Sequence, residues 1–355
     1  MGKFILIINP GSTSTKIAVY EDDKQVFEEK ISHSVEELKP FPNIISQFEF
    51  RKNLVLETLK ARNFDITKLD AVCGRGGMLR PLESGTYLVN ERMIQDVYEA
   101  KRGEHASNLG CIIAHEIAKE LNIPAFIVDP VSVDEMEDIA RISGHPLFER
   151  QCIFHALNHK ATARKVAKDV GKKYEDMNLI IAHLGGGISV ACHRKGRVID
   201  VNNALDGDGP MSPERSGTVP LGPLYKLCFS GQYTLQDIKR MNYGQGGLVA
   251  YLGTNNAKEI VKRIENGDKY AELIMDAMIY QIAKEIGACS TVFYGDVDYI
   301  VLTGGLAYEP YITSRIIERV KFIADVLVYP GEDELQALAL GALRVLNGEE
   351  EAKIY

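Results

Sequence analysis

The sequence predicts an α/β protein built from two related domains. Its 355 residues, 45% of them hydrophobic, can bury more than one core. Apolar runs that end in turn residues alternate with stretches whose apolar side chains recur every three or four positions, as strands and helices do. A strand, a glycine loop and a second strand occur twice: Asn9 and His183 each close a first strand, and 183 − 9 gives an offset of 174 residues. This offset is close to half of the chain and indicates a duplicated fold.

In the first half, apolar runs and turn residues delimit the strands. The run at residues 4–8 stops at an Asn-Pro-Gly turn, and a β-branched run at 17–20 resumes as a second strand. Another apolar run, 125–128, ends at Asp129. Helical spacing of apolar residues predicts four helices, at 54–59, 93–98, 109–121 and 155–170. Gly171 suits the C-cap of the last.

The second half repeats the opening arrangement over residues 178–204, where a Lys-Gly turn leads to a third strand. Another glycine loop, within residues 299–310, follows an apolar strand and precedes a helix. The final helix, within residues 332–348, begins with carboxylates, which the helix dipole favours, and stops at a glycine.

Composition disfavours several classes of partner. A formal net charge of −8 and a pI near 5.6 disfavour nucleic acid and anionic membranes. No apolar stretch approaches the roughly 18 residues of a membrane span, and the first residues lack a signal-peptide core, so we expect a cytoplasmic protein. The six cysteines show no metal-ligand spacing, which favours reduced thiols.

The loop between the first two strands suits a phosphate group. Residues 11–16 read Gly-Ser-Thr-Ser-Thr-Lys, in which glycine lets backbone N–H groups approach an anion, hydroxyls add donors and the lysine adds charge. The spacing of a Walker A loop is absent, and residues 185–187 do not make the dinucleotide pattern. One such loop could be an ordinary hairpin turn, whereas three of them, each after an apolar strand, favour a nucleotide phosphate site.

Charged and imidazole side chains accompany these loops. Arg75 lies among glycines at a strand end, and Arg215 lies in a loop bounded by proline and glycine, where a fixed guanidinium suits a carboxylate or a phosphate. Asp129 would orient a cation or an arginine, or act as a turn or N-cap residue. His155 and His183 are either satisfied structural histidines or groups that face the same phosphates.

Two motifs resemble the signatures of the acetokinase family, the acetate and butyrate kinases, within the actin, hexokinase and Hsp70 ATPase superfold. The family's opening motif N-x-G-S-x-S-x-K is met by Asn9, Gly11, Ser12, Ser14 and Lys16. The second motif, H-L-G-x-G, is met by residues 183–187. The resemblance runs from residue 4 to residue 334, which is nearly the whole chain.

The resemblance implies a duplicated fold of the actin, hexokinase and Hsp70 type, in which two domains with mixed sheets flanked by helices enclose a central cleft. We expect an N-terminal domain of residues 1–175 plus 333–355 that holds the acyl substrate and the phosphoryl site. A nucleotide-binding domain would span residues 176–332. The family also implies a homo-oligomer, at least a dimer.

The resemblance assigns roles to individual residues as well. It implies four catalytic groups: Arg75, Arg215, His155 and Asp129. The nucleotide, ATP or ADP, would be held by Asn9, Gly11, Ser12, Ser14, Lys16, His183, Gly185, Gly186, Gly187, Gly304 and Gly305. Asn9 and Glu334 would organise Mg²⁺. The family sequence Asn-Glu-Glu-Leu is Glu-Asp-Glu-Leu here, at residues 332–335, which leaves Asp333 as the alternative ligand.

These roles imply ATP-dependent phosphorylation of a short-chain carboxylate to an acyl phosphate and ADP. The acceptor is already an anion at neutral pH, because the pKa of a carboxyl group lies well below 7, so no general base is needed. The enzyme would position two anions in line and stabilise the phosphoryl oxygens with arginines, histidine donors and Mg²⁺.

Small residues bear on the size of the acid. Gly77 stands where acetate kinases carry a bulky aliphatic residue, and Ala106 replaces another aliphatic wall, so that together with Phe154 they predict an enlarged acyl pocket. At ~0.8 kcal/mol per buried CH₂, two more carbons favour a four-carbon acid by about tenfold or more. We therefore expect butyrate or isobutyrate, with acetate or propionate as alternatives. A non-metabolic actin- or Hsp70-like ATPase is the alternative from another class.

Overall fold

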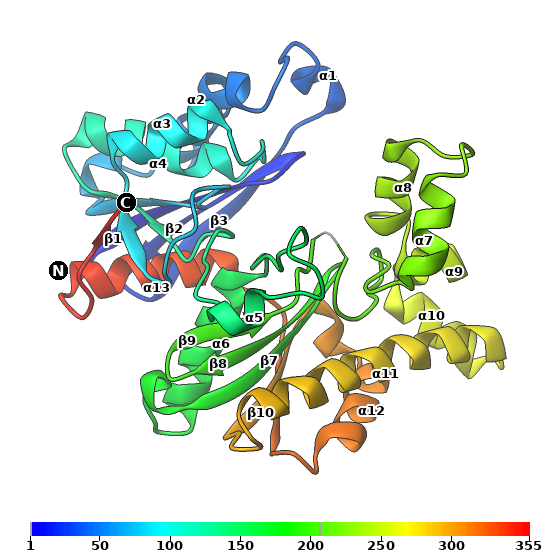
Figure 1. Cartoon of the computed structure of the whole chain (residues 1–355). Helices are drawn as coiled ribbons and strands as arrows, with labels where there is room; N and C mark the ends of the chain where they lie inside the picture. Colours follow the sequence, from blue (N-terminus) through cyan, green and yellow to red (C-terminus); the bar gives the residue numbers. More distant parts are fainter. Residues whose placement is uncertain (1, 206) are drawn as a thin grey trace. The chain divides into compact units, whose positions relative to one another are not determined.

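The computed structural model describes residues 2–205 and 207–355 and divides into two compact units (Figure 1). The first unit comprises Met1–Asp134 and Asp333–Tyr355, and the second comprises Glu135–Glu332. In the described residues each unit contains one mixed sheet with helices packed against it, which confirms the predicted α/β fold.

The first unit has a seven-stranded sheet in the order β12-β5-β6-β4-β1-β2-β3. Its strands are β1 (Phe4–Pro10), β2 (Ser14–Glu21), β3 (Lys24–Ser32), β4 (Ala71–Gly74), β5 (Thr86–Leu88), β6 (Ala125–Val128) and β12 (Lys353–Ile354). Its helices are α1 (Val35–Leu38), η1 (Ile45–Gln47), α2 (Phe48–Ala61), η2 (Ile66–Lys68), α3 (Glu91–Glu99), α4 (Asn108–Leu121) and α13 (Glu334–Leu346). β1, β4 and β6 are parallel, whereas β1, β2 and β3 pair antiparallel.

Alternating side chains of this sheet face helices on both sides. Leu6 and Ile8 of β1 belong to the apolar cluster that also contains buried residues of α2, α3 and α4. α13 packs against β1, β4 and β6 from the other face (Figure 1). α4 comes very close to β4, because a Cβ on Gly74 would lie 2.0 Å from the carbonyl oxygen of Gly110. This approach requires glycine at both positions and fixes the backbone from which Arg75 emerges.

The second unit has a five-stranded sheet in the order β11-β10-β7-β8-β9. Its strands are β7 (Asn178–Leu184), β8 (Ile188–Arg194), β9 (Arg197–Val201), β10 (Tyr299–Gly304) and β11 (Val326–Pro330). Its helices are α5 (Asp138–Arg141), α6 (Ala156–Asp169), η3 (Tyr174–Asp176), α7 (Leu221–Cys228), α8 (Leu235–Asn242), α9 (Gly247–Leu252), α10 (Ala257–Glu265), α11 (Lys269–Val292), η4 (Gly305–Tyr308) and α12 (Pro310–Val320). The long α11 and α12 share one apolar cluster with β7, β8 and β10, and α6 shares another with β7 and β10.

The two sheets repeat one arrangement, as the sequence predicts. β1 and β2 form an antiparallel hairpin around the loop at residues 11–13, and β7 and β8 form another around residues 185–187. Each first strand also pairs in parallel with a later strand, β1 with β4 and β7 with β10. The glycine loops therefore leave equivalent edges of the two sheets.

The helices predicted from apolar spacing are present, with α2 starting earlier than residue 54 and α6 matching the expected 155–170 within one residue at each end. The predicted final helix begins at Glu334 rather than at residue 332. The compact units meet after Asp134 and after Glu332. α6 packs with β7 and therefore lies in the second unit. The assignment of residues 1–175 to a substrate domain stays a prediction.

A search of the described residues for a helix long and apolar enough to cross a membrane finds none.

Candidate active site

Three polar side chains of the first unit meet at one edge of its sheet. The parallel strands β1 and β4 pair Ile8 with Gly74, so Asn9 and Arg75 leave the sheet side by side. Glu334, the first residue of α13, contacts both of them. Its Oε2 accepts a hydrogen bond from Asn9 Nδ2 at 2.7 Å, and its Oε1 is paired with the Arg75 guanidinium. A carboxylate, an amide and a guanidinium therefore share one site.

The Glu334 carboxyl is held in its ionised form. Burial raises its pKa, but the charge of Arg75, the hydrogen bonds from Asn9 and Arg75 and the charge of Lys16 outweigh burial, so that the pKa lies below its ordinary value. The group is thus a fixed negative charge at neutral pH.

The alternative metal ligand, Asp333, is engaged elsewhere. It is the N-cap of α13, and its Oδ1 accepts a hydrogen bond from the backbone N–H of Gln336 at 2.9 Å. Mg²⁺ binds one or two carboxylates and completes its shell with waters and substrate phosphates. The ionised Glu334 beside the Asn9 amide suits such an ion, and the choice between Glu334 and Asp333 as its ligand stays a prediction.

The loop at residues 11–16 is held from behind by a buried cation, Arg51 of α2. The Arg51 guanidinium donates hydrogen bonds to three carbonyl oxygens of the loop. They belong to Gly11 at 2.7 Å, Ser12 at 3.1 Å and Ser14 at 3.3 Å. The Thr13 carbonyl accepts from the backbone N–H of His33 at 2.8 Å. The carbonyl oxygens of residues 11–14 are thus all engaged, while Ser12 and Thr13 remain exposed. This arrangement suits a loop that offers N–H and hydroxyl donors to an anion.

Arg51 itself is fully buried, with 0% of its surface exposed. Burial lowers the pKa of its guanidinium to about 10, which leaves it charged at neutral pH. Its side-chain partners in the described chain are Gln47 Oε1, at 2.7 and 3.0 Å, and Thr15 Oγ1, at 3.2 Å. Since these groups are neutral, the loop carbonyls are a main stabiliser of the cation, and each fixes the other. Arg51 was not predicted as a site residue, because it belongs to no motif and lies before the helix expected at 54–59.

The residues expected to line an acyl pocket, Gly77, Ala106 and Phe154, differ from one another in their surroundings. A Cβ on Gly77 would lie 2.0 Å from Asn108 Oδ1, and this oxygen accepts a hydrogen bond from Met78 N at 2.8 Å. The volume that a larger residue would fill is therefore taken by Asn108, so Gly77 does not by itself open room for an acyl chain. Ala106 is buried just before α4, and Phe154, in the second unit, lies edge-on to a buried histidine.

Asp129 ends β6 in a left-handed backbone conformation, with φ of 38°. One carboxylate oxygen, Oδ1, accepts hydrogen bonds from Ser84 Oγ at 2.6 Å and from Gly85 N at 2.8 Å. These bonds give Asp129 the role of an anchor for the segment before β5. A catalytic role remains a prediction.

In the second unit two imidazoles stack against each other. The rings of His155 and His183 lie 3.8 Å apart at an angle of 13°. His183, at the end of β7, donates from Nδ1 to Asn158 Oδ1 at 2.9 Å, and His155, the N-cap residue of α6, bonds through Nδ1 to Ser189 Oγ at 2.9 Å. The structure therefore brings together the two histidines that the sequence singles out.

Arg215 lies against the glycine loop beside these histidines. A Cβ on Gly187 would come within 2.0 Å of the Arg215 guanidinium, so a larger residue at this position would displace the guanidinium from its present place. The guanidinium also donates to the Ala204 carbonyl and lies 5.0 Å from the centre of the Tyr243 ring. Ser212 Oγ ties the arginine loop to the glycine loop through the carbonyl of Gly186 at 2.6 Å.

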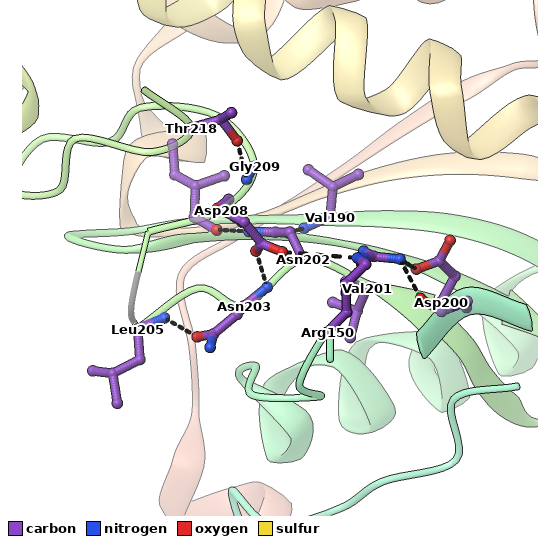
Figure 2. Close-up of polar contacts among 12 residues, drawn as sticks. Arg150, Val190, Asp200, Val201, Asn202, Asn203, Leu205, Asp208, Gly209 and Thr218 are labelled. Carbon is purple, nitrogen blue, oxygen red and sulfur yellow. Dashed lines mark hydrogen bonds and ion pairs between the residues drawn. The ribbon is translucent and has the colours of Figure 1, made fainter. Parts of the chain in front are cut away.

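A polar network holds the segment that contains Ala204 (Figure 2). Arg150 donates to Asp200 Oδ1 at 2.9 Å and to the Val201 carbonyl at 3.1 Å, and its Nε lies 3.9 Å from Asp208 Oδ2. The other oxygen of Asp208 accepts from the backbone N–H of Asn203. Burial raises the pKa of the Asp208 carboxyl against the influence of Arg150.

The network contains two residues that the sequence did not single out, Arg150 and Asp208. Their contacts with Asp200, Val201 and Asn203 hold the segment that leads to Ala204, whose carbonyl binds Arg215. In the sequence Arg150 is an isolated arginine and Asp208 belongs to an Asp-Gly turn. No sequence pattern connects these two residues, which are 58 positions apart (208 − 150).

The third glycine loop lies at the same sheet edge as His183. β10 is parallel to β7 and pairs Thr303 with His183. Gly304 has φ of 88°, and a Cβ there would lie 2.5 Å from the Leu184 carbonyl oxygen, whereas Gly305 is exposed with open space around it. The loops at 185–187 and 304–305 are therefore neighbours, as a shared nucleotide site requires.

Comparisons with known proteins agree with these features. The sequence matches the model of the acetokinase family over residues 145–325. It is 57% identical over 351 residues to butyrate kinase 1 of Clostridium acetobutylicum, which covers 99% of each chain.

Solved structures show the same fold. An acetate kinase from Porphyromonas gingivalis is similar with a TM-score of 0.80 and 20% identity, over 97% of this chain and 100% of that one. A propionate kinase from Francisella tularensis has a TM-score of 0.73 and 18% identity, over 96% of this chain and 98% of that one. Identities this low establish the fold alone.

Replacing Arg51 should weaken ATP binding without unfolding the protein. Arg51→Lys keeps the charge but cannot reach three carbonyl oxygens at once, so the loop at residues 11–16 loses its fixed orientation. We expect the Kd for ATP, measured by titration calorimetry, to rise by about tenfold, which corresponds to ~1.4 kcal/mol. Arg62→Lys, at the exposed end of the same helix, is the control and should bind as the unaltered protein does. Unchanged ATP affinity in Arg51→Lys would contradict the role given to this residue.

Proposed function

The chain belongs to the acetokinase family, and we propose that it transfers the terminal phosphoryl group of ATP to butyrate, giving butyryl phosphate and ADP in a reversible reaction. The observation that carries this proposal is the 57% identity, over 99% of both chains, to a butyrate kinase. The charged groups at the strand ends of both units support it, because they suit anionic reactants.

In the first unit, Arg75 would bind the carboxylate of the acid. A guanidinium forms paired hydrogen bonds with a carboxylate, and the Arg75 side chain, which pairs with Glu334, keeps 25% of its surface exposed, which supports this role. The nucleophile is a carboxylate oxygen that is ionised at neutral pH, so its attack on the phosphorus requires no proton acceptor. Asp129 would act at the same edge of the sheet.

In the second unit, Arg215 and His155 would stabilise the phosphoryl group in transfer. Negative charge is spread over its equatorial oxygens, and fixed N–H donors stabilise such charge most when they need no rearrangement. Arg215 is fixed by Gly187, Ala204 and Tyr243, as described above. His183 with the loops at 185–187 and 304–305 would hold the nucleotide, together with the loop at residues 11–16 of the first unit.

Mg²⁺ would be held by Glu334 and Asn9. When bound, the ion neutralises phosphate charge on the nucleotide. The described residues contain no cluster of three or more His, Cys, Asp or Glu side chains that could hold a metal, which is compatible with an ion held mainly by phosphates and waters.

We further propose a cytoplasmic homo-oligomer, at least a dimer. Large apolar side chains on and beside α7 and α8 support self-association, since Leu221, Phe229 and Leu235 are 75%, 89% and 72% exposed.

The acid preference tests the proposal directly. With acetate, propionate, butyrate and isobutyrate, acyl phosphate is trapped as the hydroxamate and kcat/KM is measured for each acid. We expect butyrate or isobutyrate to exceed acetate by about tenfold or more, from ~0.8 kcal/mol for each buried CH₂. A preference for acetate would contradict the butyrate assignment. ATP hydrolysis without hydroxamate would instead support a non-metabolic ATPase.

Removing Arg75 or Arg215 should lower the turnover rate much more than it weakens ATP binding. We expect Arg75→Ala and Arg215→Ala each to lower kcat by about 10²-fold or more, the loss that follows removal of one preorganised donor. The Kd for ATP should change little, because other groups hold the nucleotide. Steady-state kinetics and titration calorimetry measure the two effects.

The controls for this comparison are exposed arginines of each unit, Arg62→Ala and Arg240→Ala, whose ion pairs lie on the surface. Both should retain the original kcat. Full turnover in Arg75→Ala or Arg215→Ala would overturn the corresponding role.

A further inference from the structure

A continuous row of side chains links His155 to the interior of the second unit. His155 Nδ1 lies 2.9 Å from Ser189 Oγ, which lies 2.8 Å from His159 Nε2. His159 Nδ1 lies 3.2 Å from His193 Nε2, and His193 Nδ1 lies 2.7 Å from the hydroxyl of Tyr174. Each of these four distances is within hydrogen-bond range. The row joins α6, β8 and η3, and nothing in the proposed mechanism uses its inner members.

The two inner histidines are buried and neutral. His159 and His193 are each 0% exposed. Burial lowers the pKa of His159 well below its ordinary value, and the neighbouring His193, His183 and Lys160 lower it further. Burial does the same to the pKa of His193, with Lys160 and Arg164 adding to the effect. Each ring therefore carries one N–H at neutral pH, and its other nitrogen is an acceptor.

Neutral rings in such a row have only two possible proton arrangements. In the first arrangement His193 accepts a hydrogen bond from Tyr174 at Nδ1 and donates from Nε2 to His159. His159 accepts this bond at Nδ1 and donates from Nε2 to Ser189. Ser189 in turn donates its hydroxyl hydrogen to His155 Nδ1. In the opposite arrangement every bond is reversed, and His155 donates from Nδ1 towards Ser189. One end of the row therefore sets the protonation of the other.

We propose that Tyr174, His193, His159 and Ser189 are positioning residues that keep neutral His155 protonated on Nε2, so that it donates a hydrogen bond to the phosphoryl group. This inference rests on the proposed function, which places His155 at that group. Phosphoryl oxygens only accept hydrogen bonds, so His155 must present an N–H, and Tyr174 is the phenol donor that starts the row in the required direction.

Basic and acidic side chains both lie beside the row. Lys160 pairs with Glu135 at 2.6 Å, and its Nζ lies 5.6 Å from the centre of the Tyr174 ring. On the other side His155 stacks on His183, whose Nε2 lies 3.6 Å from Glu332. A charged His155 would face His183 ring to ring, with Lys160 and Arg164 on the same helix. When His155 accepts a hydrogen bond at Nδ1, its neutral ring carries the proton on Nε2. The ring then offers an N–H without an added positive charge.

Histidine tautomers provide a direct test that does not depend on activity. In protein labelled with ¹⁵N-histidine at pH 8, the ring nitrogen shifts distinguish Nε2–H from Nδ1–H. We expect His155, His159 and His193 all to carry the proton on Nε2. Protons on Nδ1 of the three rings would show the reverse arrangement and overturn the proposal. Assignment uses single His→Gln variants, each lacking one signal.

The pH dependence of Tyr174→Phe is the functional test. Phenylalanine keeps the ring beside Lys160 but removes the donor, so the reverse arrangement becomes populated. In that arrangement His155 carries a proton on Nε2 only when it is charged, and histidines in general lose that charge as pH rises across this range. We expect kcat of the variant to fall by about threefold or more between pH 6 and pH 8.5. The original protein, in which both forms of His155 donate from Nε2, should show no such fall.

Controls separate this role from a structural one. Tyr329→Phe removes a hydroxyl from a ring that packs on the same apolar cluster as Tyr174, but that hydroxyl bonds Asp169 at 2.9 Å, so its pH profile should be unchanged. A loss of kcat in Tyr174→Phe that is equal at every pH would indicate a structural role and refute the proposal.

A second pair of variants acts at the other end of the row. Ser189→Ala should lower kcat with little change in the KM for ATP, and Ser189→Thr, which keeps the hydroxyl, should restore it. Equal activity of the alanine and threonine variants would also count against the row. If the unaltered protein makes no acyl phosphate, the proposed function fails, whereas the tautomer measurement still decides the proton arrangement.

Discussion

The close approach of neighbouring segments at the strand ends is the constraint on which the polar sites depend. A Cβ would come within 2.0 Å of a neighbouring group at Gly74 and Gly187, and within 2.5 Å at Gly304. In each case the close contact lies beside a functional group: Arg75 follows Gly74, Arg215 rests on Gly187, and Gly304 continues the strand next to His183. Larger residues at Gly74 and Gly304 would separate these segments, because backbone groups cannot yield as flexible side chains do, and a larger residue at Gly187 would displace the Arg215 guanidinium.

Charge burial is the second organising principle. A charge removed from water is tolerated when neighbouring groups replace its solvation. The Glu334 carboxylate has Arg75 and Asn9, and the Arg51 cation has the loop carbonyls. His159 and His193 illustrate the alternative, since burial keeps them neutral. The same compensation that stabilises each group also fixes its orientation.

Much of the architecture was predictable from local patterns. Apolar runs and periodicities identified β1, β2, β6, α4 and α6, and the repeated strand, loop and strand identified the two hairpins. Arg75, Arg215, His155 and His183 were recognisable because glycine-rich surroundings and family motifs mark them. Two features could not be predicted in this way: the bounds of the first compact unit and the packing of Asn108 into the space beside Gly77. Both depend on which helix lies against which strand.

The fold class, the family and the glycine loops follow from sequence alone, since each depends on residues near one another in the chain. Tertiary structure decided which charges meet. Asn9 and Glu334 are 325 positions apart, Arg51 and Gly11 are 40, and His159 and Ser189 are 30. Hydrogen bonds act over about 3 Å and leave no periodicity in the sequence, so such pairs become visible only when folding brings the segments together.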